Sequence, residues 1–167
     1  MPRLAIPALI ATLCLSLPAM AAVELADGIK DLAPEIRQYL EKTAAGDSGE
    51  AVVPYVSEAI RGDIDGDGKQ DTFVAFSMPN PDGGNFTSLH QALFIDTSGK
   101  QVLRAERANG STGTAQGISF VPQRIEAGRI AGIYMGYAPD DGACCPSRKW
   151  PGQILFRDGK LIEEGAP

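Results

Sequence analysis

The sequence predicts an α+β fold in which one N-terminal helix packs on a single, mostly antiparallel β-meander sheet. Two observations predict it. Residues 31–45 carry apolar side chains at helical spacing, whereas from residue 52 onward short β-rich segments alternate with Gly, Asn and Asp. Tight turns at 97–100, 126–128 and 158–159 join neighbouring segments, and consecutive hairpins make an antiparallel meander. The length of 167 residues suits one domain.

Residues 1–21 are expected to be a cleaved secretory signal peptide. Arg3 precedes an apolar segment at 4–17, and small residues follow, which is the order of a secretory signal. The apolar segment is shorter than the ~20 residues that a membrane-spanning helix needs. The sequence therefore predicts a periplasmic or secreted location, with no stable membrane insertion after cleavage. The mature chain would hold an N-terminal helical segment, 22–50, and a β-rich part of the same domain, 51–167.

The individual elements follow from local patterns. Asp31 can cap the helix, Pro34 suits its first turn because a missing N–H costs nothing there, and Gly46 is a natural stop. The apolar face of the helix consists of Leu32, Ile36, Tyr39, Leu40 and Thr43. Eight strands are expected near residues 54–60, 72–77, 89–96, 101–106, 118–125, 130–137, 153–157 and 160–163.

The composition excludes two classes of function. The chain has 21 acidic and 15 basic residues, a net charge of -6, whereas a nucleic-acid binder shows a basic surface. Its single histidine excludes sites that need two imidazoles, including the common zinc hydrolase arrangements. Removal of the predicted signal takes away Arg3 and Cys14, so the mature chain would keep two cysteines, Cys144 and Cys145.

The strongest chemical signal is an acidic, glycine-rich loop. Four carboxylates within nine residues repel one another unless a cation neutralises them, and Ca²⁺ takes six to eight oxygen ligands from such loops. Mg²⁺ suits the loop less, because it prefers to keep bound water. The predicted Ca²⁺ ligands are the side chains of Asp63, Asp65, Asp67 and Asp71, the last one bidentate, and the backbone carbonyl of Lys69, whose ammonium would point to solvent. The alternative is an acidic, solvated turn.

This loop resembles the calcium loop of FG-GAP and VCBS-type repeats, in which a D-x-D-G-D-G-x-x-D segment leads into a strand. It is not an EF-hand, because position twelve is Val74 and residues 72–76 have the pattern of a strand. The resemblance implies the ion and not the whole fold. We expect a structural ion, since a catalytic ion needs an open coordination position beside a nucleophile or base, and none is near in sequence.

The second signal is the pair Cys144 and Cys145 in the turn-rich segment 137–147. Three interpretations remain open: a strained disulfide between the two neighbours that rigidifies the loop, two buried free thiols, or a redox, metal or intermolecular role. A copper site would need neighbours such as Met135 or His90.

Together the two motifs resemble a group of small exported bacterial proteins, among them the LppP/LprE-type lipoproteins, which carry a similar Cys-Cys-Pro-Ser loop. The resemblance spans roughly Tyr55 to Glu163. It implies location and architecture but supplies no reaction. Such relatives often end their signal in a lipobox. Leu13, directly before Cys14, is too large for one, and we expect a soluble mature protein.

The sequence therefore predicts an exported, calcium-stabilised binding or interaction domain that is not an enzyme. Its partner would be a protein or an envelope carbohydrate, and an inhibitor or immunity role is a variant of this hypothesis. One alternative is a Ca²⁺-assisted hydrolase that uses Asp71 or Asp67 with His90. The other is a redox or copper-handling protein that uses Cys144 and Cys145.

Overall fold

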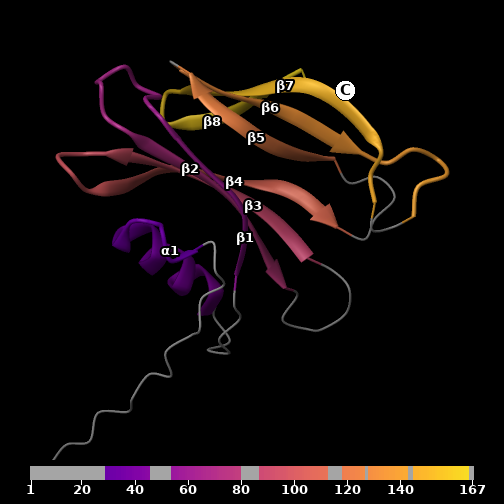
Figure 1. Cartoon of the computed structure of the whole chain (residues 1–167), viewed down its shortest axis with the longest axis horizontal. Coiled ribbons are helices and arrows are strands. Elements are labelled where there is room, and N and C mark those ends of the chain that lie inside the picture. The colour runs from indigo at the N-terminus through magenta and orange to yellow at the C-terminus, as the bar shows by residue number, and fades with distance from the viewer. Residues whose placement is uncertain are drawn as a thin grey trace, which may run out of the picture.

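The computed structural model describes residues 29–45, 54–79, 87–112, 118–126, 128–142 and 145–165 (Figure 1). The predicted signal peptide and Cys144 lie outside these residues. The elements in order are α1 (Pro34–Ala45), β1 (Tyr55–Gly62), β2 (Asp71–Pro79), β3 (Thr87–Asp96), β4 (Gln101–Thr112), β5 (Ser119–Glu126), β6 (Arg129–Gly136), β7 (Arg148–Arg157) and β8 (Lys160–Glu164). No helix within the described part is long and apolar enough to cross a membrane.

The strands form two four-stranded antiparallel sheets, ordered β1-β2-β3-β4 and β5-β6-β7-β8. The predicted mostly antiparallel pairing is confirmed, whereas the prediction of one continuous sheet is wrong. The reason lies in β2 and β3, which are apolar on both faces: Phe73 and Leu93 point one way, Val74 and Phe94 the other, and all four are buried. A helix can cover only one of these faces, so the second sheet covers the other.

Figure 1 shows α1 on one side of the first sheet and the sheet β5–β8 on the other. The helix side is an apolar cluster in which Ile36 and Leu40 of α1 pack with Val74, Phe76 and Phe94. Tyr39 adds edge-on ring contacts, with its centroid 5.3 Å from that of Phe94. This packing fixes the outer face of β2 and β3, and it leaves their other face for the second sheet.

The space between the sheets is filled by a second apolar cluster, whose buried members are Ile64, Phe73, Leu93, Ile95, Phe120, Ile130, Tyr134 and Ile154. Two glycines make room for its rings. A Cβ at Gly132 would lie 2.6 Å from the Phe120 ring, and one at Gly152 would lie 2.2 Å from the Tyr134 ring. Cβ atoms in real structures do not approach a ring so closely. Because protein interiors are close-packed, neither ring can move aside, and both positions require glycine.

The expected turns are confirmed, and most strands are longer than expected, β4 and β7 by the most. Gly99, Gly128 and Gly159 have φ of 85°, 75° and 71°, the left-handed values that tight turns need. β4 continues to Thr112, beyond the expected end at 106. β7 begins at Arg148, ahead of the expected start at 153, and so includes Pro151 and Gly152, which are poor strand formers that tertiary packing accommodates here.

Candidate metal centre

The acidic loop is the connection between β1 and β2. Gly62 at the end of β1 pairs with Asp71 at the start of β2, so the intervening residues form the tip of a hairpin. Ile64 anchors this tip, because its side chain is buried between the sheets and its carbonyl accepts a hydrogen bond of 2.7 Å from the Gly128 N–H. The loop is therefore fixed to both sheets at its first turn.

Asp71 is the buried member of the loop, with no exposed surface. One carboxylate oxygen accepts the N–H of Ile64 at 2.8 Å, and the other accepts the N–H of Asp96 at 2.9 Å. Burial raises the pKa of Asp71, while the two N–H donors oppose that rise in pKa and the nearby Asp65 and Asp67 charges add to it. Asp71 thus links the loop to the end of β3 and keeps a carboxylate at the base of the hairpin.

Asp63 organises the turn itself. Its Oδ1 accepts the N–H groups of Gly66 at 2.7 Å and Asp67 at 3.1 Å, and its Oδ2 accepts the N–H of Gly68 at 2.8 Å. Gly66 and Gly68 have φ of 81° and 83°, so these positions favour glycine. The sequence pattern D-x-D-G-D-G thereby supplies both the acceptor and the residues that can bend around it.

Three carboxylates converge at this turn. One oxygen from each of Asp63, Asp65 and Asp71 lies within 4.8 Å of the others. Ca²⁺ holds oxygen ligands at about 2.3–2.6 Å, so two oxygens at roughly 4.8 Å or less can share one ion. A carboxylate has about four lone-pair sites, and the N–H bonds to Asp71 occupy only some of them. The donor set is all oxygen and anionic, which suits a hard divalent cation.

Asp67 and Lys69 are arranged differently from the expectation. The Lys69 ammonium does not point freely to solvent: it contacts Asp67 Oδ2 at 2.5 Å, and the Lys69 N–H donates to Asp67 Oδ1 at 2.8 Å. The hydrogen bonds from Lys69 lower the pKa of Asp67, and the hydrogen bond to Asp67 raises the pKa of Lys69. Asp67 therefore lies outside the converging triad, in an exposed ion pair on the same loop.

His90 is not brought to the acidic loop. Asp96, whose N–H reaches Asp71, is six positions further along β3 than His90. At about 3.3 Å per residue the two ends are roughly 20 Å apart. The His90 ring stacks on Phe76 with centroids 5.4 Å apart, and its Nε2 lies 3.0 Å from Ser88 Oγ. Burial lowers the pKa of His90, partly offset by the charge of Glu106.

The cysteine loop connects β6 to β7. Asp141 holds its two ends together, because Oδ2 accepts the N–H of Ala138 at 2.6 Å and the N–H of Ser147 at 2.8 Å. These donors lower the pKa of Asp141. Cys145 is disulfide-bonded. The other two cysteines of the chain, Cys14 and Cys144, lie outside the described residues, so the predicted pairing remains a prediction.

The suggested copper neighbours are on different sheets. Met135 lies near the end of β6, next to the cysteine loop, whereas His90 lies on β3 of the first sheet. Met135 therefore lies on a strand that leads into the cysteine loop, whereas His90 lies on a strand of the other sheet.

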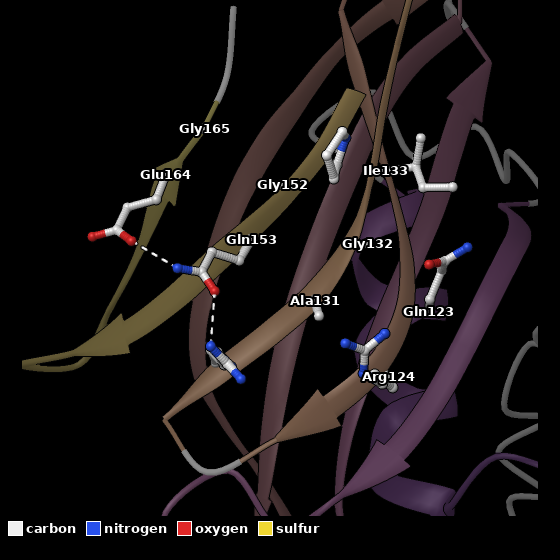
Figure 2. Close-up of a pocket in the computed structure, with 11 residues that line it drawn as sticks. Gln123, Arg124, Ala131, Gly132, Ile133, Gly152, Gln153, Glu164 and Gly165 are labelled. Carbon is white, nitrogen blue, oxygen red and sulfur yellow. Dashed lines mark hydrogen bonds between the residues drawn. The ribbon is translucent and has the colours of Figure 1, made fainter. Parts of the chain in front are cut away.

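A groove of about 700 Å³ lies on the outer face of β5–β8 and was not expected from the sequence (Figure 2). Polar side chains cross it: Arg129 Nη1 donates to Gln153 Oε1 at 3.4 Å, and Gln153 Nε2 donates to Glu164 Oε2 at 2.8 Å. Ala131, Ile133 and Pro151 also line it. These residues come from three strands, so local sequence patterns carry no signal for the groove.

Comparison with known proteins found no relative of this chain. No protein-family model matches the chain. No curated protein is similar to it. No solved structure matches the fold.

Proposed function

We propose that the chain is an exported binding domain whose fold is stabilised by one Ca²⁺ ion in the β1–β2 loop. The observation that carries the proposal is the convergence of Asp63, Asp65 and Asp71, with one oxygen of each within 4.8 Å of the others. Without a cation these charges repel; with one they become ligands, and the repulsion turns into a contribution to stability.

The position of the loop favours a structural ion. Asp71 and Ile64 tie it to β3 and to the β5–β6 turn, so a bound ion would hold three parts of the fold together. The hydrolase alternative needs His90 as a base beside the loop. His90 lies roughly 20 Å along β3 from Asp96, the residue whose N–H Asp71 binds, so this alternative is not supported. Asp67 and the Lys69 carbonyl remain the proposed completing ligands, and Asp67 must then release the Lys69 ammonium.

Thermal unfolding of the mature protein in EDTA and in millimolar Ca²⁺ tests the ion. At a dissociation constant of about 10 µM and about 1 mM Ca²⁺, binding adds roughly 2.7 kcal/mol. Asp65→Asn should remove most of this gain without destabilising the ion-free protein, because it takes away one of three repelling charges. Asp65 is exposed, and among the described residues its carboxylate accepts only the N–H of Asp67, at 3.2 Å. Glu41→Gln, an exposed acid on α1, is the matched control. An equal Ca²⁺ gain in Asp65→Asn would contradict the proposal.

We further propose that Cys144 and Cys145 form a static disulfide that rigidifies the β6–β7 loop. The disulfide state of Cys145 and the clamp by Asp141 support a fixed loop rather than a redox centre. Asp141→Ala should speed reduction by dithiothreitol, because it removes the one oxygen that accepts both N–H groups. Asp140→Ala, at an exposed neighbour in the same turn, should not. Equal reduction rates in the two variants would contradict the clamp.

The location and the partner are proposed from the sequence. A periplasmic or secreted protein resembling the LppP/LprE type should lose residues 1–21, which intact-mass measurement of the exported protein checks. The proposed partner is a protein or an envelope carbohydrate, and the groove on the outer face of β5–β8 is a surface where one could bind. A full-length mass for the exported protein would contradict the signal peptide.

A further inference from the structure

The outer face of the β5–β8 sheet holds the groove of about 700 Å³ (Figure 2). In Figure 1, α1 and the first sheet both lie on the other side of β5–β8. Alternation along the strands decides which side chains enter the groove. Ile130 and Ile154 are buried between the sheets, so the adjacent Ala131 and Gln153 point to the outer face.

Two rows of side chains cross the groove side by side. Strand pairing puts Gln153 opposite Ala131 of β6 and opposite Glu164 of β8. The neighbouring row pairs Ile133 with Pro151. The second row is two residues further along the strands, so the two rows lie about 7 Å apart. The groove thus presents a polar row beside an apolar row, at a spacing that one sugar ring spans.

The polar row is held in a fixed arrangement. Figure 2 shows Gln153 joined to Glu164: Gln153 Nε2 donates to Glu164 Oε2 at 2.8 Å. Gln153 Oε1 accepts from Arg129 Nη1 at 3.4 Å, and Arg129 Nε donates to Glu126 at 2.5 Å. The Gln153 amide keeps a second N–H and a second lone pair for a ligand, and Glu164 keeps further lone pairs. Because these side chains are already positioned, a ligand has little rotamer entropy to overcome.

The charges around the groove cancel. Arg124 and Arg129 both donate to Glu126, at 2.6 Å and 2.5 Å, and Glu164 balances the second arginine. An anion would have to compete with Glu126 for the arginines, and a cation would meet two arginines beside Glu164. Electrostatic complementarity therefore favours a neutral ligand that has both hydrogen-bond donors and acceptors.

An extended protein segment fits this groove less well than a carbohydrate. β6 and β7 are the inner strands of their sheet, so their N–H and C=O groups are used in the ladders and cannot bind an added strand. A ligand therefore has to use the side chains of the two rows. A sugar ring carries hydroxyl groups that donate and accept at its rim, and it has apolar C–H faces, which matches a polar row beside an apolar one.

We propose that the groove binds a neutral oligosaccharide, with hydroxyl groups of one sugar on Gln153 and Glu164 and its C–H face on Ile133 and Pro151. This inference rests on the proposed function, in which the partner is a protein or an envelope carbohydrate, and it selects the carbohydrate. The acidic loop contributes no residue to the lining of the groove, so the sugar site and the calcium site can be tested separately.

An NMR titration tests the proposal, with the side-chain amide signals of Gln153 as the reporter. The probes are cellotetraose and tetra-N-acetylchitotetraose, which are neutral, and tetragalacturonate, which is acidic. We expect a saturable shift of the Gln153 amide signals with at least one neutral tetramer at millimolar concentration, and none with tetragalacturonate. The absence of a shift with both neutral tetramers, or binding of tetragalacturonate as tight as that of the neutral tetramers, would overturn the proposal.

Gln153→Ala removes the central member of the polar row. Its affinity for the neutral tetramer should fall by about fivefold or more, as expected for the loss of at least one hydrogen bond of ordinary strength. The backbone amide signals of Ala131 and Ile133 report binding in this variant. Gln38→Ala, which removes an exposed glutamine on α1, is the matched control and should bind like wild type. Equal affinities of wild type and Gln153→Ala would overturn the proposal.

Two further measurements on the same samples separate the possible failures. Bound Ca²⁺ is assayed beside the titration. Wild type that holds Ca²⁺ but binds neither neutral tetramer would overturn this inference alone, whereas wild type that binds a neutral tetramer without holding Ca²⁺ would contradict the calcium proposal alone. Light scattering gives the oligomeric state, and a stable dimer that buries the Gln153 amide would assign the groove to a second copy of the chain and overturn the sugar site.

Discussion

Asp71→Asn is the substitution that probes the loop most deeply in the absence of the ion. The Asp71 carboxylate is fully buried and accepts two backbone N–H groups, at 2.8 Å from Ile64 and 2.9 Å from Asp96. Asparagine keeps one acceptor oxygen, and its NH₂ group faces the other N–H as a second donor. One buried N–H therefore loses its partner, whichever way the amide is oriented.

The magnitude follows from two opposing effects. A buried donor left without an acceptor costs about 1–3 kcal/mol. Against this, burial raises the pKa of Asp71, so the folded state disfavours the ionised side chain, and a neutral amide relieves part of that cost. We expect a net loss of roughly 2 kcal/mol at neutral pH. For a chain of this size the midpoint of thermal unfolding should fall by about 6 °C.

Urea unfolding in EDTA measures this loss without any contribution from Ca²⁺. Asp65→Asn is the control within the same loop: Asp65 is exposed, and its replacement should cost less than about 0.5 kcal/mol. If Asp71→Asn were as stable as Asp65→Asn in EDTA, the two N–H bonds would contribute nothing, and the reasoning that Asp71 links the hairpin to β3 would be refuted.

Three further predictions concern other parts of the molecule. Lys69→Gln should tighten Ca²⁺ binding by about threefold in calorimetry, because Asp67 no longer has to leave an ion pair; an unchanged affinity would exclude Asp67 as a ligand. Burial lowers the pKa of His90, so its contribution to stability is present above about pH 6.5 and is lost as the pH falls below that value. In His90→Asn the urea concentration at the midpoint of unfolding should therefore fall less steeply as the pH is lowered below about 6.5. An identical slope in wild type and variant would contradict this prediction. Gly152→Ala should cost about 3 kcal/mol, because its Cβ would lie 2.2 Å from the Tyr134 ring, and Tyr134→Leu should restore part of that loss in the double variant.

The sequence was sufficient for the local structure. The residues of each expected strand overlap a strand of the structure, and the turns at Gly99, Gly128 and Gly159 are where glycine was expected to turn the chain. Such features depend on neighbours along the chain, which the sequence shows directly. The division into two sheets depends on which strands pack face to face. Its sequence signal is the unbroken apolar runs 73–76 and 92–95, typical of strands buried on both faces.

The candidate site was predictable to the same degree. The spacing of Asp63 and Asp65 indicates that both can face one ion, and both lie with Asp71 in the structure. The contacts of Asp71 with the N–H of Asp96 and of Lys69 with Asp67 were not predictable. The first joins residues that are distant in the sequence, and the second is one of several ion pairs that a flexible lysine in an acidic loop can form.

Equilibrium dialysis tests the central claim most directly. The mature protein, freed of metal with EDTA, is dialysed against Ca²⁺ in the presence of excess Mg²⁺, beside Asp65→Asn and the surface control Glu41→Gln. The proposal predicts that wild type and Glu41→Gln retain one Ca²⁺ per chain and that Asp65→Asn retains much less. If wild type retained no Ca²⁺, or if Asp65→Asn retained as much as wild type, the acidic loop would be a solvated turn and not a calcium site.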